Sequence, residues 1–312
     1  MPEIWLSYGD SEVSLKLKRE DLDDVLSLNP PESSISEVNA KYYVTDGIDR
    51  SEQIAREVFR DLAPLRPGEQ LAEEIVDGYL VKRPLGLAET VLICAVRSDP
   101  VYWFTGPHSL TAKLMAAEEE VIKRKEGFGS CSEDGAVWFS RRLLETSGVK
   151  AYCYFGRSGR AISGPGTEVY EKLRSYFSSF SIKHRHKSFV IASAGGTPYD
   201  DNLKEALLSV YGLRGILKEG SELIIVAKCG GGLGDEGLRR AILGERSESY
   251  AVKVLRELQQ RATVSIVSSL PLTYVEGLGM KGYSSLTEAF EGARKAGKAF
   301  IVENSYLFCR SG

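Results

Sequence analysis

The chain has 312 residues with a formal net charge of −3; 43% of its residues are hydrophobic and 27% are charged. That length suffices for two domains, and the composition is typical of a soluble globular protein. The slightly acidic balance provides no positive field for nucleic acid or an anionic membrane, so we expect neither as a partner and expect a small molecule instead.

Cysteine usage and hydropathy bear on the compartment. The five cysteines are widely spread, and no two form a Cys-x-x-Cys pair. This pattern argues against a disulfide framework or a zinc ribbon and fits a reducing cytoplasm. No apolar run approaches the ~20 residues of a membrane-spanning helix, and the sequence opens on a strand pattern rather than a signal peptide. We therefore expect a cytoplasmic protein.

The first 185 residues mix helix and strand patterns. Alternating apolar residues around Gly9-Asp10 predict a hairpin, and the apolar run 90–96 predicts a buried strand. A loop rich in aromatic residues follows, with His108 just before a helix that carries Lys113. The other expected elements are a helical turn at 19–28, helices at 51–62, 71–81, 110–125, 136–147 and 168–180, and a strand at 150–155.

Residues 186–312 alternate strands and helices. Strands are expected at 188–194, 222–228, 263–269 and 299–303, and helices at 201–218, 235–260 (in two pieces) and 285–296. This alternation predicts right-handed βαβ crossovers and a doubly wound, mostly parallel sheet. The predicted fold class is therefore α/β, with two α/β domains at 1–185 and 186–312 and a cleft between them.

Two glycine-bearing turns follow the first two strands of the second domain. Ligands collect at the carboxyl edge of an open α/β sheet, where backbone amides and helix N-termini favour anions. We predict a small anionic substrate there, bound by Gly195, Gly196, Asp200, Asn202, Gly230, Gly231, Gly232 and Gly234. The alternative is a pair of tightly packed βα turns, with an Asp or Asn capping the helix that follows.

Candidate proton carriers are few, because the chain has only three histidines. His108 lies in a loop before a helix and five residues ahead of Lys113, so we predict a catalytic role for both; the alternative for His108 is a structural hydrogen bond. His184 and His186 lie in a basic run that favours a solvated linker over a metal site, because no third ligand is suggested. Cys229 is the one cysteine beside a helix N-terminus and a lysine, a setting that would lower the pKa of its thiol.

The stretch Ile191-Ala-Ser-Ala-Gly-Gly-Thr-Pro-Tyr-Asp-Asp-Asn-Leu203 resembles the C-terminal domain of the lactate racemase family, the nickel-pincer nucleotide enzymes. The resemblance continues through Gly220 to Gly234 and more loosely through Ser285 to Val302, and Ala88 to Lys113 looks like a divergent form of an upstream family segment. It implies two α/β domains that racemise or epimerise α-hydroxy acids, a nickel-pincer cofactor tethered to a lysine, here Lys113, and a pair of acid/base histidines.

Several positions depart from the family pattern. Val101 stands where the family has one of its histidines, and Glu205 and Leu208 replace a Gln and a Lys. The N-terminal domain is also shorter than the family's. Two hypotheses follow: a racemase or epimerase of a small α-hydroxy acid, or a non-catalytic relative that binds a small anion or serves as a scaffold. A homodimer is compatible with either.

Overall fold

The computed structural model describes residues 3–65, 71–125, 133–179 and 186–308. The chain divides into two compact units, unit 1 from the described residues of Met1–Asn29 and Ile182–Arg310, and unit 2 from those of Pro30–Ser181. The predicted domain at 1–185 is therefore corrected at its start, because the first 29 residues belong with the second half of the chain. The predicted boundary near residue 185 lies outside the described residues.

Unit 1 is built on a six-stranded sheet with the order β16-β15-β14-β13-β17-β3, and every neighbouring pair in it is parallel. The strands of this unit are β1 (Glu3–Tyr8), β2 (Ser11–Lys16), β3 (Leu22–Leu26), β13 (Lys187–Ser193), β14 (Leu217–Val226), β15 (Ala262–Val267), β16 (Lys281–Tyr283) and β17 (Ala299–Val302). Its helices are α6 (Leu203–Val210), α7 (Glu236–Ile242), α8 (Tyr250–Gln259), α9 (Leu272–Gly277) and α10 (Leu286–Ala293). The predicted doubly wound parallel sheet is confirmed.

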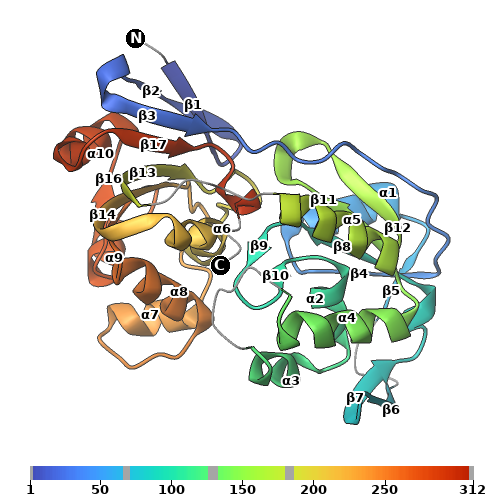
Figure 1. The fold of residues 1–312 in the computed structure, drawn as a ribbon. Helices are drawn as coiled ribbons and strands as arrows, with labels where there is room; N and C mark the ends of the chain where they lie inside the picture. The colour runs from blue at the N-terminus through green and yellow to red at the C-terminus, as the bar shows by residue number, and fades with distance from the viewer. Residues whose placement is uncertain (1–2, 66–70, 126–132, 180–185, 309–312) are drawn as a thin grey trace. The chain divides into compact units, whose positions relative to one another are not determined.

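Both faces of this sheet are covered, so its central strands are apolar on both sides. Phe189 and Ile191 of β13 pack in a cluster with α10 and with Ile4 and Leu6 of the β1–β2 hairpin, which lies on the same face (Figure 1). The intervening Val190 is just as buried and faces the opposite side, where α6 and α8 pack against each other.

The N-terminal segment supplies part of this architecture. The hairpin predicted around Gly9-Asp10 is present as β1 and β2, paired in antiparallel register. The helical turn predicted at 19–28 is only a short 3-10 turn, after which β3 adds to the edge of the sheet beside β17. That pairing joins segments more than 270 positions apart in the sequence. A hydrogen bond also connects them, since Asn304 donates its side-chain amide to the carbonyl of Leu28, 276 residues away.

Unit 2 contains a five-stranded sheet with the order β12-β11-β8-β4-β5, parallel except for β12. The strands of this unit are β4 (Tyr42–Thr45), β5 (Ala63–Pro64), β6 (Leu71–Val76), β7 (Tyr79–Pro84), β8 (Thr90–Ala95), β9 (Ser98–Asp99), β10 (Trp103–Phe104), β11 (Lys150–Tyr154) and β12 (Ala161–Pro165). Its helices are α1 (Asp49–Val58), α2 (Pro107–Leu114), α3 (Glu118–Lys123), α4 (Gly135–Ser147) and α5 (Gly166–Ser179).

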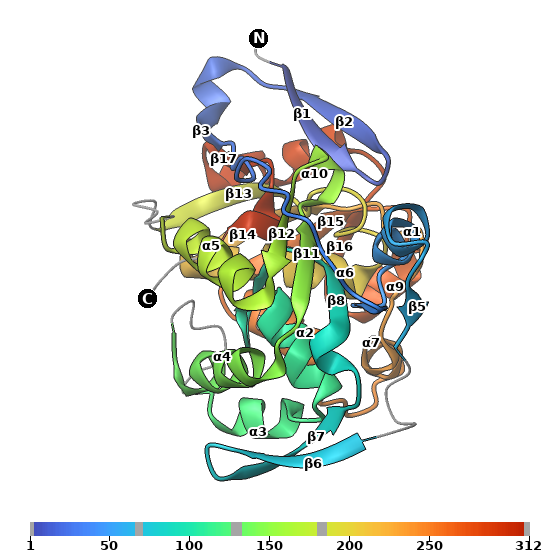
Figure 2. The same ribbon diagram turned by 90° about the vertical axis from the view of Figure 1, so that its right-hand side faces the viewer.

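Two helix predictions in unit 2 are wrong. Residues 71–81 form the β6–β7 hairpin, which turns at Asp77-Gly78, both with positive φ, and packs beside α4 (Figure 2). Asp-Gly is a strong two-residue hairpin signal, and it decides the structure over the helical spacing of the apolar residues. The helix predicted at 110–125 is broken into α2 and α3, because Ala116 adopts a left-handed φ of 51°.

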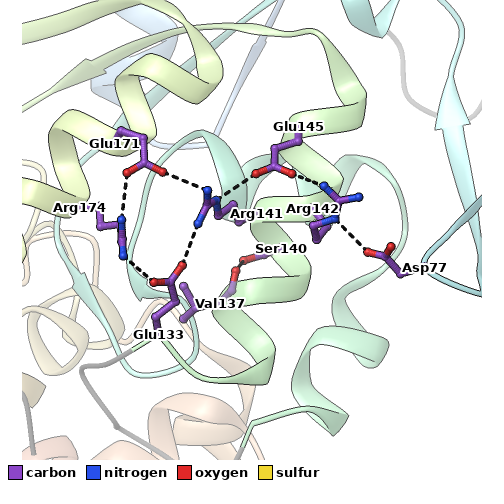
Figure 3. Close-up of polar contacts among 9 residues, drawn as sticks. All are labelled: Asp77, Glu133, Val137, Ser140, Arg141, Arg142, Glu145, Glu171 and Arg174. Carbon is purple, nitrogen blue, oxygen red and sulfur yellow. Dashed lines mark hydrogen bonds and ion pairs between the residues drawn. The ribbon is translucent and has the colours of Figure 1, made fainter.

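Helices α4 and α5 are joined by a network of ion pairs (Figure 3). Glu133 bridges Arg141 of α4 at 3.2 Å and Arg174 of α5 at 2.8 Å, and Glu171 pairs with both arginines. Glu145 adds contacts to Arg141 and the neighbouring Arg142. These side chains are roughly one quarter to one half exposed, so solvent screens the network and its contribution to stability is modest.

Candidate functional site

The two glycine turns predicted to bind an anion do lie together in unit 1. Both follow neighbouring parallel strands, β13 and β14, and therefore leave the sheet at the same carboxyl edge. The order of the strands reverses here, since β14, β15 and β16 lie on one side of β13 and β17 lies on the other. Such a switch point is where open α/β sheets bind ligands.

The turns are bonded mainly to each other. The amide of Cys229 donates to the carbonyl of Asp200 at 2.8 Å, and the amide of Gly231 donates to the carbonyl of Asp201 at 2.7 Å. Cys229 has a positive φ of 54° and is buried, and burial raises the pKa of its thiol. Its setting therefore does not produce the reactive thiolate that a helix N-terminus beside a lysine would favour.

Asp200 ties three segments together. Its Oδ2 accepts the amide of Gly9 in the hairpin turn at 2.6 Å and the amide of Lys228 after β14 at 3.0 Å. The side chain is fully buried, and among the described residues its Oδ1 has no hydrogen-bond partner. Burial raises the pKa of this carboxyl, against the opposing effect of the two amides. Asp200 thus has a structural role at the centre of this edge.

The N-terminus of α6 is also occupied by the protein itself. Its first amides, of Leu203 and Lys204, donate to the carbonyls of Gly232 and Leu233 at 2.9 and 3.1 Å. The Asn202 side chain accepts the amide of Glu205 at 3.0 Å as the N-cap. The second glycine turn therefore presents carbonyls to this helix, and these amides are not open to an anion.

Close packing explains two of the glycines. A Cβ at Gly195, whose φ is 112°, would overlap the ring of Tyr306, which stacks on Tyr199 with 3.9 Å between ring centroids. A Cβ at Gly234 would overlap the side chain of Asn202. Anion binding by the glycines, Asp200 and Asn202 stays a prediction, and the alternative of tightly packed, capped turns describes the contacts that are present.

Two donors at this edge remain open. The side chain of Lys228 is exposed, and within the described part of the chain its ammonium makes no ion pair. The neighbouring Gly230 is also exposed, and its amide donates to no acceptor among the described residues. The aliphatic stem of Lys228 lies against the hairpin turn, since a Cβ at Gly9 would overlap it. An ammonium and a free amide two residues apart can hold one carboxylate.

His108 is in the core of unit 2. It is 0% exposed, and its ring packs against Phe104 and Tyr170 with 4.8 Å between ring centroids in each case. Its Nε2 lies 3.1 Å from the carbonyl oxygen of Tyr102, which makes Nε2 the protonated nitrogen of the neutral ring. Burial lowers its pKa to about 4, so the ring is neutral at pH 7. These contacts match the structural alternative for His108.

Lys113 is exposed and lies in the last turn of α2. Five residues along an α-helix correspond to ~500°, so Lys113 and His108 project about 140° apart. The Lys113 side chain points to solvent and the His108 side chain points into the core, so the two do not line one binding site for a lysine-tethered cofactor. Among the residues that the structure describes, no group of three or more His, Cys, Asp and Glu side chains is placed to hold a metal ion.

Sequence reasoning missed an aspartate in unit 2 that resembles Asp200 in its role. Asp46 follows β4, and its carboxylate accepts the amide of Ala95 at the end of β8 at 2.8 Å and the hydroxyl of Ser51 in α1 at 2.6 Å. Burial raises its pKa, and the positive charge of Arg97 opposes that shift. The signal was an Asp between the strand-like Tyr42–Thr45 and a helix, in a stretch with little other pattern.

The two sheets, one parallel and one parallel except for β12, define an α/β protein of two units, and its fold is that of lactate racemase. The structure of the lactate racemase apoprotein from Thermoanaerobacterium thermosaccharolyticum matches with a TM-score of 0.70 over 99% of this chain and 100% of that chain, at 13% identity. A structural-genomics protein from Thermotoga maritima matches with a TM-score of 0.53 over 87% and 84%, also at 13% identity.

The similarity to known proteins lies in the fold. No family model matches the sequence, and no curated protein matches it either. The fold predicted from the resemblance at 191–203 is confirmed, and a likeness at 13% identity shows the fold alone. Within the described ranges, none of the helices has the length and apolar character needed to cross a membrane.

Proposed function

We propose that this chain binds a small carboxylate at the carboxyl edge of the unit 1 sheet and does not racemise it. The observation that carries the proposal is the way polar groups are used at the two glycine turns. The first amides of α6 and both backbone amides held by Asp200 are consumed within the protein, while the ammonium of Lys228 and the amide of Gly230 stay open. An α-hydroxy acid is the ligand class that the fold of lactate racemase suggests.

The absence of racemisation in this proposal rests on His108. Racemising an α-hydroxy acid requires a group that removes a proton within hydrogen-bond reach of the substrate. His108, the predicted proton carrier, is fully buried and bonded to Tyr102, and its partner position in the resembling family segment is Val101. A neutral ring that is fully buried among aromatic side chains is not accessible to a substrate as a base.

The test is a binding titration with D- and L-lactate, glycolate and malate, measured by isothermal titration calorimetry. Lys228→Gln keeps most of the stem that packs on Gly9 but removes the charge, and we expect it to weaken binding at least about tenfold. Lys218→Gln is the matched control, because Lys218 is an exposed lysine at the opposite end of the same strand, β14. Failure of every acid to bind, or equal loss in both variants, would overturn the anion site.

Catalysis is tested separately by chiral chromatography of each acid after incubation with protein purified from its native host. We expect the enantiomer supplied to be recovered unchanged. Formation of the opposite enantiomer would overturn the non-catalytic part of the proposal while leaving the binding result untouched.

The racemase alternative has one observation in its favour, the exposed amine of Lys113, which is free to be modified. It requires nickel and an added mass on Lys113 in the protein from its native host. Intact mass and metal analysis of that material decide the matter, since unmodified, nickel-free protein contradicts it. A cytoplasmic location and a homodimer stay predictions, as does the expectation that neither nucleic acid nor membrane is a partner.

A further inference from the structure

Cys94 and Cys153 lie directly opposite each other in the sheet of unit 2. They are register partners on the parallel strands β8 and β11, and their Sγ atoms are 3.3 Å apart. Both are free thiols, with exposures of 2% for Cys94 and 0% for Cys153. Neither residue has a role in the proposed anion site, which lies in unit 1.

The backbone already suits a covalent link at this position. Neighbouring strands lie about 4.8 Å apart, and a disulfide spans Cα atoms about 4.4 to 6.8 Å apart, so the strands need not separate or approach. The sulfurs must come closer, from 3.3 Å to the bond length of about 2.05 Å. Small rotations about the two Cα–Cβ bonds can supply this change without altering the ladder of hydrogen bonds.

We propose that Cys94 and Cys153 form a reversible disulfide when the protein is exposed to peroxide. Peroxide oxidises one thiol to a sulfenic acid and releases one water; the second thiol then attacks that sulfur, the S–S bond forms and a second water leaves. In total the two thiols lose two protons and two electrons, and one hydrogen peroxide is reduced to two waters. A dithiol reductant reverses the step by thiol–disulfide exchange.

The surroundings make this reaction slow and selective. The hydrogen bond to Cys153 and, after it, burial raise the pKa of Cys94, and the charge of Lys113 opposes that shift only in part. Little thiolate is therefore present at neutral pH, and a bulky oxidant such as oxidised glutathione cannot reach either sulfur. Hydrogen peroxide is small enough to enter with local fluctuations of the sheet. The same shielding slows the reduction of the finished disulfide in the folded protein.

The test uses a variant in which Cys131, Cys229 and Cys309 are replaced by serine, so that only the pair remains. The reduced protein is incubated with hydrogen peroxide, quenched with catalase, unfolded and alkylated, and then analysed by mass spectrometry. We expect a loss of two mass units, no alkylation at either position, a linked pair of peptides containing Cys94 and Cys153, and a higher melting temperature. Dithiothreitol added to unfolded protein should restore both alkylation sites.

Cys94→Ala and Cys153→Ala in the same background are the controls, and each should leave the remaining thiol open to alkylation or further oxidation. Oxidised glutathione should act on the folded pair far more slowly than hydrogen peroxide does. Two alkylated thiols after prolonged peroxide treatment would overturn the proposal, as would separate oxidation of each sulfur to a sulfinic acid. If the triple serine variant does not fold, the linked peptide is sought in the unmodified chain.

Discussion

Removing the side chain of Asp200 should unfasten the hairpin from the sheet of unit 1. Asp200→Ala leaves the amides of Gly9 and Lys228 without their acceptor and opens a cavity in the core. Each hydrogen bond to a charged acceptor contributes about 1.5 to 3 kcal/mol. Allowing for the cost of burying the carboxylate, we expect a loss of about 3 to 4 kcal/mol in the free energy of unfolding.

Asp200→Asn is the matched control. Its amide oxygen can take the place of Oδ2 and accept both amides, while its NH2 group replaces Oδ1, which has no partner among the described residues. We expect a loss of about 1 kcal/mol or less, because a neutral acceptor forms weaker bonds but costs less to bury. The contrast between the two variants isolates the acceptor from the charge.

The pH dependence gives a second measure of the same group. Because the folded-state pKa of Asp200 is raised, the folded protein holds its proton more tightly than the unfolded chain. Its contribution to stability is therefore greatest below the unfolded pKa of about 3.9 and is lost as pH rises through the folded pKa. Asp200→Asn should remove this fall, so the stability difference between the two proteins should shift in favour of the variant as pH rises.

Urea unfolding gives the free energies, and hydrogen exchange measured on peptides covering residues 4–17 and 226–233 locates the change. We expect faster exchange in both peptides of Asp200→Ala and near-normal exchange in Asp200→Asn. Unfolding of Asp200→Ala within about 0.5 kcal/mol of the parent, with unchanged exchange at both peptides, would refute a structural role for this carboxyl.

Three further predictions concern other contacts. The pKa of His108 is lowered to about 4, so the folded protein does not take up the proton that the unfolded chain accepts, and the stability of unit 2 should fall by about 2 kcal/mol between pH 7 and pH 5. His108→Phe should lose this pH dependence in thermal melts recorded across that range. An unchanged pH dependence in the variant would contradict the assignment to His108. Gly195→Ala should lower the free energy of unfolding by about 3 kcal/mol or more, because the new methyl group overlaps Tyr306. Gly220→Ala, also at positive φ but with open space around it, should lower it by about 1 kcal/mol. Equal losses in urea unfolding would refute the packing argument. Glu133→Gln should lower the free energy of unfolding by about 1 kcal/mol or less, because it removes two ion pairs at the surface. This loss should vanish near 1 M salt, where the screening length is about 3 Å. A loss that does not depend on salt would indicate that Glu133 acts through packing rather than through its charge.

Local sequence patterns predicted the elements whose signals are local. The apolar run 90–96 became the buried strand β8, and the periodic residues of 136–147 became α4. The errors arose where a distant partner decides the structure or where no residue marks a break. Leu22–Leu26 is a strand only because β17 pairs with it. At Ala116 the helix breaks at a positive φ, although no glycine or proline in the sequence indicates a turn there.

The candidate site was predicted in position but not in the direction of its hydrogen bonds. Glycine turns after two strands correctly indicated one shared edge of a sheet. The sequence could not indicate that carbonyls of Gly232 and Leu233 cap α6, or that Asp200 faces inward toward Gly9, because both depend on contacts between distant segments. Likewise, His108 reads as a loop residue in sequence, and only the packing of Phe104 and Tyr170 encloses it.

The path of the chain through unit 1 has a consequence for its biosynthesis. Unit 2 is contiguous, so a ribosome releases all of it before unit 1 is finished. Strand β3 must wait for β17, and at 5 to 20 residues per second the 276 positions between Leu28 and Asn304 take about 14 to 55 s to translate. Until β13 and β14 are translated, the emerging N-terminal hairpin has an apolar side and no sheet strand to cover, which makes it a natural target for chaperones that hold nascent chains.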